Sequence, residues 1–242
     1  MKRICTICAR GGSKGVPNKN IRDICGRPLL AYTIEQALLS DLFDVVVVSS
    51  DSDEILRVAS QFPEVVLVKR PAELASDKSS KIPAIWHALM QVEMPNSPFQ
   101  TIVDLDPTSP LRLIDDIKNA VYELEGTGCS NLITGTPSHR SPYFNLVEIG
   151  SGGNVYLSKM FDPPITCRQD SPPCFDMNAS VYVWRRDSFG VDIGLFQADT
   201  RIYAMPPERS IDIDTELDFE MVEFLMTRNT NSKKVRNEAT HG

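Results

Sequence analysis

A short glycine-rich stretch near the amino end, residues 8–20, gathers basic side chains. It reads CARGGSKGVPNKN and sets Arg10, Lys14 and Lys19 among three glycines, between an apolar run and a helical pattern. Glycines allow positive φ and let a ligand approach the backbone closely, and cations beside exposed amides attract anions. The glycines alone are equally typical of a surface turn, but together with the cations they predict a cradle for a polyanion.

Two familiar phosphate motifs are excluded for this stretch. It lacks the Gly-Lys-Ser/Thr of a P-loop and the Gly-x-Gly-x-x-Gly order of a dinucleotide site. The charge distribution still favours an anionic ligand, because residues 1–30 hold seven basic side chains and one acidic one. Their net charge is +6, whereas the whole chain carries −7. Such a local concentration indicates a small polyanionic ligand.

An acidic motif near the other end of the chain, SIDIDTELD at residues 210–218, is a candidate metal site. In an extended backbone Asp212 and Asp214 project to the same side. Two carboxylates this close repel each other unless a cation lies between them, and Mg²⁺ prefers one or two carboxylates together with substrate phosphates. The alternative is a helix N-terminus that Asp214 or Thr215 caps, with Glu216 favouring the dipole. We favour Mg²⁺ binding.

A second acidic pair, Asp104 and Asp106, ends the apolar run at residues 101–105. A buried strand rarely carries acids without a partner. Asp106, nearer the expected cleft, is the better candidate for binding a ligand, and Asp104 is expected to be hydrogen-bonded within the fold. The three histidines lie on an apolar helix, in a loop and in the tail, so no nucleophilic triad is evident. This fits phosphoryl-type chemistry, in which positioning and charge neutralisation dominate.

Alternating apolar segments predict the scaffold. Short, largely apolar runs at residues 4–7, 45–48, 65–68, 101–105 and 132–133 predict strands, and the uninterrupted run 45–48 is typical of a parallel strand covered on both faces. Helical spacing predicts intervening helices, the first starting at Pro28 and the second capped by Asp51 or Ser52. The serines of the polar segment 69–81 can cap the third helix, face a ligand, or do both. The alternation predicts a three-layer α/β domain with a mainly parallel sheet and a cleft at the carboxyl ends of its strands.

The pattern changes between about residues 136 and 178. A hairpin is predicted at residues 143–157, followed by a proline-rich loop at 162–173, before strands return at 179–184 and 202–205. A closing helix at residues 217–226 is predicted to turn Leu217, Met221, Val222 and Leu225 inward. Residues 1–228 thus form one domain with an insertion, and residues 229–242 a polar, frayed tail.

Composition excludes several classes of function. In 242 residues, 42% hydrophobic residues suffice for a full core. Residues 31–242 carry a net charge of −13, which argues against nucleic-acid binding. No apolar run approaches the roughly 20 residues of a membrane span, and we see no signal-peptide core. The six cysteines are expected to be free thiols, with Cys5 and Cys8 buried on opposite faces of the first strand. We expect a soluble cytoplasmic protein.

Five separated motifs together resemble the CMP-sialic acid synthetases, the cytidylyltransferases that activate nine-carbon 2-keto acids. The motifs are ARGGSKGVPNKN, RPAELASD, DPTSPLR, CRQDSPPCFDMNASVY and SIDIDTELD, and they span nearly the whole chain. The resemblance implies a nucleotide-diphospho-sugar-transferase-like fold and a homodimer whose inserted hairpin region reaches the partner's active site. It also implies Mg²⁺-dependent transfer of CMP from CTP to the sugar acid, with release of pyrophosphate.

The resemblance further assigns residues to each role. Catalytic roles fall to Arg10, Lys14 and Asp212, and the metal to Asp212 with Asp214. Nucleotide contacts are implied for Ala9, Arg10, Gly12, Ser13, Lys14, Lys19, Asn20, Arg70, Ser79 and Ser80, with the triphosphate at the three cations. Sugar contacts are implied for Asp106, Thr108, Ser109, Phe144, Arg168 and Gln169.

Two departures from the sialic-acid pattern concern the sugar pocket. This chain has Asp106 where sialic-acid members commonly have glutamine before Pro-Thr-Ser-Pro, and Phe144 where some bacterial members have lysine. ICTICARGGSKG, DLDPTSPLR, SPYFNLVEI and FDMNASVYVWRRD look more like the branch that acts on legionaminic acid, a diacetamido bacterial relative of sialic acid. N-acetylneuraminate is the alternative acceptor. A transferase acting on a sugar phosphate and a non-catalytic sugar-nucleotide sensor are competing functions.

Overall fold

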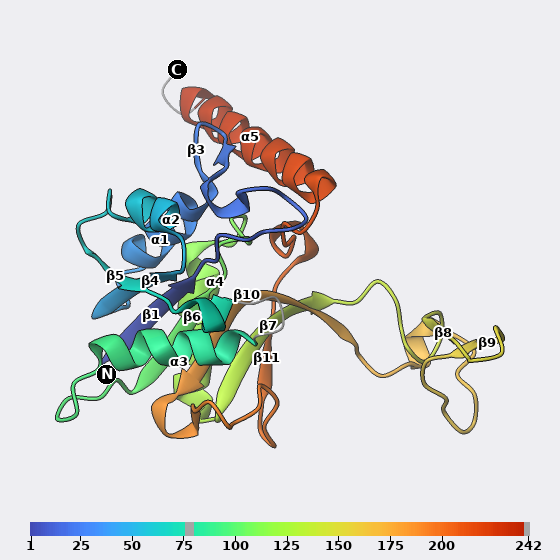
Figure 1. Cartoon of the computed structure of the whole chain (residues 1–242). Helices are drawn as coiled ribbons and strands as arrows, with labels where there is room; N and C mark the ends of the chain where they lie inside the picture. Colours follow the sequence, from blue (N-terminus) through green and yellow to red (C-terminus); the bar gives the residue numbers. More distant parts are fainter. Residues whose placement is uncertain (76–79, 240–242) are drawn as a thin grey trace.

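A computed structural model of the chain shows a seven-stranded sheet between two layers of helices (Figure 1). The structure describes residues 1–75 and 80–239, apart from the side chains of Arg168 and of residues 229–239. The strands of this sheet are β1 (Arg3–Cys8), β4 (Val45–Ser50), β5 (Val65–Lys69), β6 (Thr101–Leu105), β7 (Asn131–Pro137), β10 (Phe175–Arg185) and β11 (Arg201–Ala204). Their order is β11-β7-β10-β6-β1-β4-β5, and β10 is antiparallel to β6 and β7 while the other pairs are parallel. The predicted fold class is confirmed.

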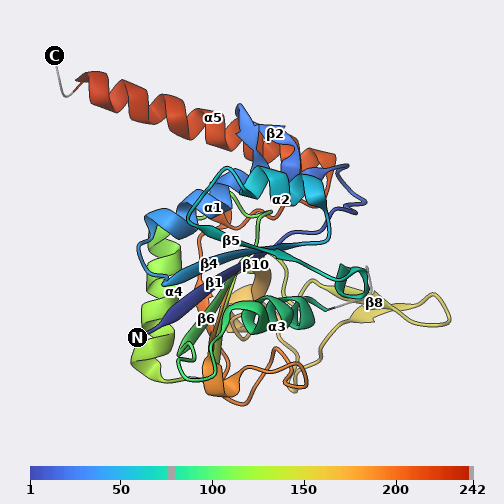
Figure 2. The ribbon, with the colours of Figure 1, turned by 60° about the vertical axis from the view of Figure 1, so that its left-hand side comes forward.

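Helices cover both faces of the sheet (Figure 2). The helices α1 (Leu29–Leu39), α2 (Asp53–Ala59) and α4 (Ile114–Thr127) pack on one face, and α3 (Lys81–Val92) packs on the other. Each helix turns its predicted apolar stripe toward the sheet, as the fully buried Ile34 of α1 and Ile85 of α3 show. Burial of these stripes on a sheet that is apolar on both sides builds two cores.

Local details refine three predictions. The hydroxyl of Ser52 accepts a hydrogen bond from the N–H of Ile55, so Ser52 caps α2 as one of the two expected caps. Pro28 lies just before α1 instead of at its first position, because it closes a short hairpin of β2 (Asp23–Ile24) and β3 (Arg27–Pro28). Cys5 and Cys8 belong to the cores on opposite faces of the sheet, as expected, and all six cysteines are free thiols.

The order of the strands places a crevice beside β1. From β1 the chain moves outward through β4 to β5, then returns by α3 to β6 on the other side of β1. At such a reversal the loops after neighbouring strands diverge, and open α/β sheets bind ligands there. The basic loop follows β1, and Asp106 follows β6. Both predicted binding segments therefore leave the sheet at the same crevice.

The predicted insertion forms an arm that extends away from the body of the molecule (Figure 1). Its tip is the hairpin of β8 (Val147–Ile149) and β9 (Val155–Leu157). Large apolar side chains of the arm are exposed, among them Ile149 (75%), Val155 (62%) and Met160 (83%). Single exposed apolar residues are ordinary on a protein surface, but several gathered on one arm form an apolar surface of its own.

The closing helix, α5 (Glu216–Ala239), differs from its prediction in facing and in length. Among its described side chains, Val222 is buried and Leu225 packs partly buried, as predicted, whereas Leu217 and Met221 are exposed and Phe219 is buried in their place. The helix packs on a cluster that includes Val16, Leu29 and Ile213, and not on the sheet. The helix also continues through the stretch expected to fray, since no proline or glycine interrupts residues 217–239. None of the helices in the described part of the chain has the length and apolar composition needed to cross a membrane.

Candidate active site

A cavity of about 370 Å³ opens at the crevice beside β1 and collects most of the predicted site residues. The basic loop and the acidic motif, from opposite ends of the chain, line the same cavity. The predicted chemistry requires Lys14 and Asp214 to face one cavity, and it would have failed if they lay on opposite surfaces. The predicted residues that line the cavity are Arg10, Ser13, Lys14, Lys19, Asn20, Arg70, Ser80, Asp106, Thr108, Asp212 and Asp214.

Several predicted residues lie elsewhere. Ala9 is buried beneath the loop, and its N–H donates to the carbonyl of Ser49 at 3.0 Å. Ser109 is fully buried, and Gly12 is exposed outside the cavity lining. Phe144 and Gln169 lie on the arm, away from the cavity of their own chain. Ser79 and the side chain of Arg168 fall outside the described residues.

Gly15 explains how the basic loop reaches the acidic motif. A Cβ atom built on Gly15 would lie 1.9 Å from the carbonyl oxygen of Asp214, far inside van der Waals contact. The expected positive φ is absent at Gly11, Gly12 and Gly15, and the left-handed residue of this loop is Asn18, with φ 52°. The prediction about backbone turning was therefore wrong. Gly15 is needed for close approach of two backbone segments.

Lys19 also joins the basic loop to the acidic motif. Its ammonium lies 3.2 Å from Asp214 Oδ1 and also donates to the carbonyl oxygen of Ile213. The sequence prediction gave Lys19 only a triphosphate role. Its contacts hold the acidic motif against the basic loop, with the Asp214 side chain still 75% exposed.

Asp214 and Thr215 were the two candidate caps of the helix that follows the acidic motif, and the structure shows Thr215 in this role. The Thr215 hydroxyl accepts from the N–H of Asp218 at 3.2 Å, and an Asp218 carboxylate oxygen accepts from the N–H of Thr215 at 2.8 Å. This reciprocal pair starts α5 and leaves the carboxylates of Asp212 and Asp214 in the cavity lining.

Two buried polar side chains in the cavity lining have unused hydrogen-bonding groups. Arg70 is 6% exposed and its Nη2 is ion-paired with Asp51 Oδ1 at 3.6 Å, but its Nε and Nη2 have no hydrogen-bond partner among the described residues. Asn20 is 4% exposed and donates from Nδ2 to the Arg10 carbonyl at 3.0 Å, whereas its Oδ1 lacks a partner within the described chain. Leaving such groups unsatisfied is costly, so they favour a ligand that offers acceptors beside a donor. The edge of a pyrimidine base has this pattern.

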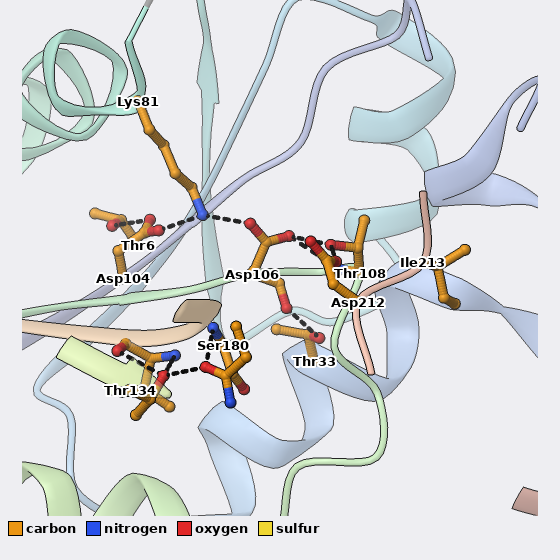
Figure 3. A network of polar contacts seen from close by, with 12 residues as sticks. Thr6, Thr33, Lys81, Asp104, Asp106, Thr108, Thr134, Ser180, Asp212 and Ile213 are labelled. Atoms are coloured by element: carbon orange, nitrogen blue, oxygen red, sulfur yellow. Dashed lines mark hydrogen bonds and ion pairs between the residues drawn. The ribbon is translucent and has the colours of Figure 1, made fainter. Parts of the chain in front are cut away.

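Lys81 is a site residue that sequence reasoning missed. Its Nζ bridges Asp104 Oδ2 at 2.6 Å and Asp106 Oδ2 at 2.8 Å (Figure 3). Burial would lower the pKa of Lys81, but the two carboxylates outweigh it and raise the pKa. Asp104 is fully buried and also accepts from the Thr6 hydroxyl at 2.8 Å, as expected of a structural acid. The sequence gives no sign of this role for Lys81, because no spacing rule relates the first residue of α3 to acids on and after β6. The contact is evident only in the folded structure.

Arg112 is a second missed residue, within the DPTSPLR motif. It is 1% exposed and donates from Nη1 to the carbonyl oxygens of Asp106 at 3.3 Å and Ser180 at 2.5 Å. Burial lowers the pKa of Arg112 to about 10. The guanidinium fixes the backbone at the point where Asp106 leaves the sheet.

The acidic side of the cavity suits a divalent cation. Burial and the negative charges of Asp106 and Asp214 raise the pKa of Asp212 to about 6, although Thr108 donates a hydrogen bond to it. Burial acts the same way on Asp106, but the ammonium of Lys81 and the hydrogen bonds from Thr108 lower its pKa to about 2. Asp212 is thus a carboxylate crowded by negative charge, which a cation would relieve.

The number of carboxylates also fits Mg²⁺. Among the described residues no group of three or more His, Cys, Asp or Glu side chains is arranged around a common metal position. Asp212 and Asp214 supply two carboxylates beside a basic loop that suits phosphates. Mg²⁺ prefers this mixture of one or two protein carboxylates with substrate phosphates and water.

Comparison with known proteins now adds to this geometry. Residues 4–143, more than half of the chain, match the model of the cytidylyltransferase family. The chain belongs to this family. A protein of Campylobacter jejuni named CMP-N,N'-diacetyllegionaminic acid synthase is 46% identical to this cytidylyltransferase over 96% of the chain and 97% of the relative. A protein of Campylobacter coli named post-translational flagellin modification protein B is 45% identical over 92% and 94%.

A solved structure gives the same fold for this cytidylyltransferase. CMP:2-keto-3-deoxy-manno-octonic acid synthetase complexed with CTP superposes with a TM-score of 0.68, covering 95% of this chain and 100% of the other, at 17% identity. The predicted resemblance to the CMP-sialic acid synthetases, and within them to the legionaminic acid branch, is confirmed by the family match and by the relative named for legionaminic acid.

Proposed function

We propose that this cytidylyltransferase transfers CMP from CTP to the anomeric hydroxyl of a nonulosonic acid, N,N'-diacetyllegionaminic acid, and releases pyrophosphate. The observation that carries the proposal is the meeting of the basic loop and the Asp212–Asp214 pair across one cavity. The name of the Campylobacter jejuni relative supports the choice of acceptor. N-acetylneuraminate is the alternative acceptor.

The cavity supports an in-line displacement at the α-phosphorus of CTP. The anomeric oxygen forms a bond to this phosphorus while the bond to the pyrophosphate oxygen breaks. Arg10 and Lys14, both in the cavity lining, would neutralise charge that grows on the phosphates. Asp212 is a candidate to accept the proton of the attacking hydroxyl, because its raised pKa lies near neutral pH. Mg²⁺ held by Asp212 and Asp214 would supply further charge neutralisation at the phosphates.

A homodimer and a cytoplasmic location complete the proposal. The arm carries the predicted sugar contacts Phe144 and Gln169, neither of which lines the cavity of its own chain, and its tip exposes apolar side chains. Insertion of the arm into a partner's cavity would bring these residues to the acceptor and cover the apolar surface. The use of CTP supports a location in the cytoplasm.

The unsatisfied groups of Asn20 and Arg70 lead to a prediction about the base. Cytosine offers an amino group where uracil has an oxygen, and Asn20 Oδ1 is a buried acceptor. We expect the wild-type protein to prefer CTP over UTP, and Asn20→Ala to reduce the ratio of the two kcat/KM values about tenfold or more. Steady-state pyrophosphate release with each nucleotide measures the ratio. The KM for the sugar acid, for which Asn20 has no proposed contact, is the internal control; an unchanged ratio would contradict the role of Asn20.

An acceptor panel tests the proposed function. With CTP and Mg²⁺ we expect the highest kcat/KM for N,N'-diacetyllegionaminate, compared with pseudaminate, N-acetylneuraminate and 3-deoxy-manno-octulosonate. A sugar 1-phosphate should release no pyrophosphate, because its anomeric oxygen is already esterified. Faster turnover of N-acetylneuraminate would shift the assignment to the alternative acceptor. Binding of CTP without any product across the panel would indicate a sensor.

A further inference from the structure

A continuous set of polar contacts runs from the core of the sheet to Asp212 (Figure 3). It begins at the fully buried Asp104, passes through Lys81 to Asp106, and continues to Thr108. The Thr108 hydroxyl lies 2.7 Å from Asp106 Oδ1 and within hydrogen-bond distance of Asp212 Oδ1. The set therefore ends on a carboxylate of the proposed metal pair.

Thr108 holds Asp212 through its backbone as well. The carbonyl oxygen of Thr108 accepts from the N–H of Ile213 at 3.1 Å, which ties the acidic motif to the loop after β6. The Thr108 N–H donates to Asp106 Oδ1 at 3.0 Å. The residue next to Asp212 and the Asp212 side chain are thus both attached to Thr108.

The opposite end of this set is anchored in the central sheet. Asp104 lies within β6 and is held by Thr6 of the neighbouring strand β1. The ammonium of Lys81 forms one ion pair with Asp104 and a second with Asp106 Oδ2. The Asp106 carboxylate thus has one oxygen bound to Lys81 and the other to Thr108.

We propose that Lys81, Asp106 and Thr108 are positioning residues that fix the orientation of the Asp212 carboxylate for metal binding. Groups that hydrogen-bond to a metal ligand restrict its rotamers, so that less freedom is lost when the metal binds. This role extends beyond the sugar contact predicted for Asp106 and Thr108. It rests on the Mg²⁺ site of the proposed function, but not on the identity of the acceptor.

The decisive experiment uses a matched pair of substitutions at Thr108. Thr108→Val keeps the shape of the side chain and removes the hydroxyl, whereas Thr108→Ser keeps the hydroxyl. The dissociation constant of Mn²⁺, used alone as the probe, is measured for each full-length protein by electron paramagnetic resonance. We expect Thr108→Val to weaken Mn²⁺ binding about tenfold or more, and Thr108→Ser to stay within about twofold of the wild-type protein.

A control variant separates this effect from general loss of packing. The buried Thr101 hydroxyl belongs to a different network, 2.9 Å from Glu125 Oε1, at the first residue of strand β6. Thr101→Val makes the same change in the same sheet and should leave the Mn²⁺ dissociation constant within about twofold. Lys81→Met is expected to weaken Mn²⁺ binding as Thr108→Val does, but it also leaves Asp104 unpaired. The decision therefore rests on the Thr108 pair.

The outcomes distinguish this inference from the proposed function. Unchanged Mn²⁺ binding in Thr108→Val, with a raised KM for the sugar acid, would overturn the positioning role and leave a sugar contact. A wild-type protein without measurable Mn²⁺ binding would overturn it too. CMP transfer by the wild-type protein in the acceptor panel is a separate result, and its failure would count against the proposed function alone.

Discussion

Asp212→Asn is expected to lower kcat for CMP transfer about 10³-fold, with a much smaller change in the KM for CTP. The substitution keeps the size of the side chain and its contact with Thr108 but removes the negative charge. That charge is proposed both to hold Mg²⁺ and to accept a proton, two contributions that act in the transition state. Pyrophosphate release over a series of Mg²⁺ concentrations measures the effect.

Asp218→Asn is the matched control for this prediction. It lies in the same acidic motif, but its carboxylate caps α5, accepting from the backbone N–H groups of Asp214 at 3.2 Å and Thr215 at 2.8 Å. We expect this control to change stability slightly and kcat only a few-fold, since Asp218 lies outside the cavity lining. If Asp212→Asn kept more than a tenth of the wild-type kcat at saturating Mg²⁺, the proposed role of Asp212 would be wrong.

Gly15→Ala should reduce kcat about 10²-fold even if the protein still folds. The new methyl group would collide with the backbone carbonyl of Asp214, and no flexible side-chain atom is available to yield. Either the basic loop or the acidic motif must therefore move. A displacement of about 1 Å between catalytic groups is enough to cost this much in rate. Steady-state kinetics, together with the melting temperature, measure the loss.

Gly12→Ala tests whether the effect is specific to the junction. A Cβ atom on Gly12 would meet nothing within 4 Å, and its φ is not in the left-handed region. It loses the same amount of chain freedom in the same loop, so we expect only a few-fold change in kcat. Equal losses in the two variants would show that flexibility of the loop, and not contact with Asp214, sets the rate.

These two predictions differ in how far the sequence alone could support them. Asp212 was predictable because alternating apolar and acidic residues in SIDIDTELD place both acids on one side of an extended chain. Gly15 was predicted to matter for the wrong reason. A glycine needed for close approach looks the same in the sequence as one needed for positive φ, and only the position of a distant backbone distinguishes them.

Most strands and helices of the fold were predictable from local sequence patterns. The uninterrupted apolar run at residues 45–48 is typical of a parallel strand that helices cover on both faces. The facing of α5 was only partly predictable in this way. Val222 and Leu225 face inward as predicted, but the cluster around Val16 buries Phe219 and leaves Leu217 and Met221 exposed.

The sequence by itself determined the chemistry that this chain can carry: cations on a glycine-rich loop, a pair of acids at a fixed spacing, and the strands and helices that bear them. These properties depend on residue type and on neighbours a few positions away. The tertiary structure alone decided that Lys81 neutralises Asp104 and reaches Asp106, that Lys19 joins Asp214, and that Thr108 holds Asp212. Such pairings join residues far apart in the chain. An unpaired buried charge is unfavourable, and the packing of the sheet and helices determines which distant residue lies close enough to pair with it.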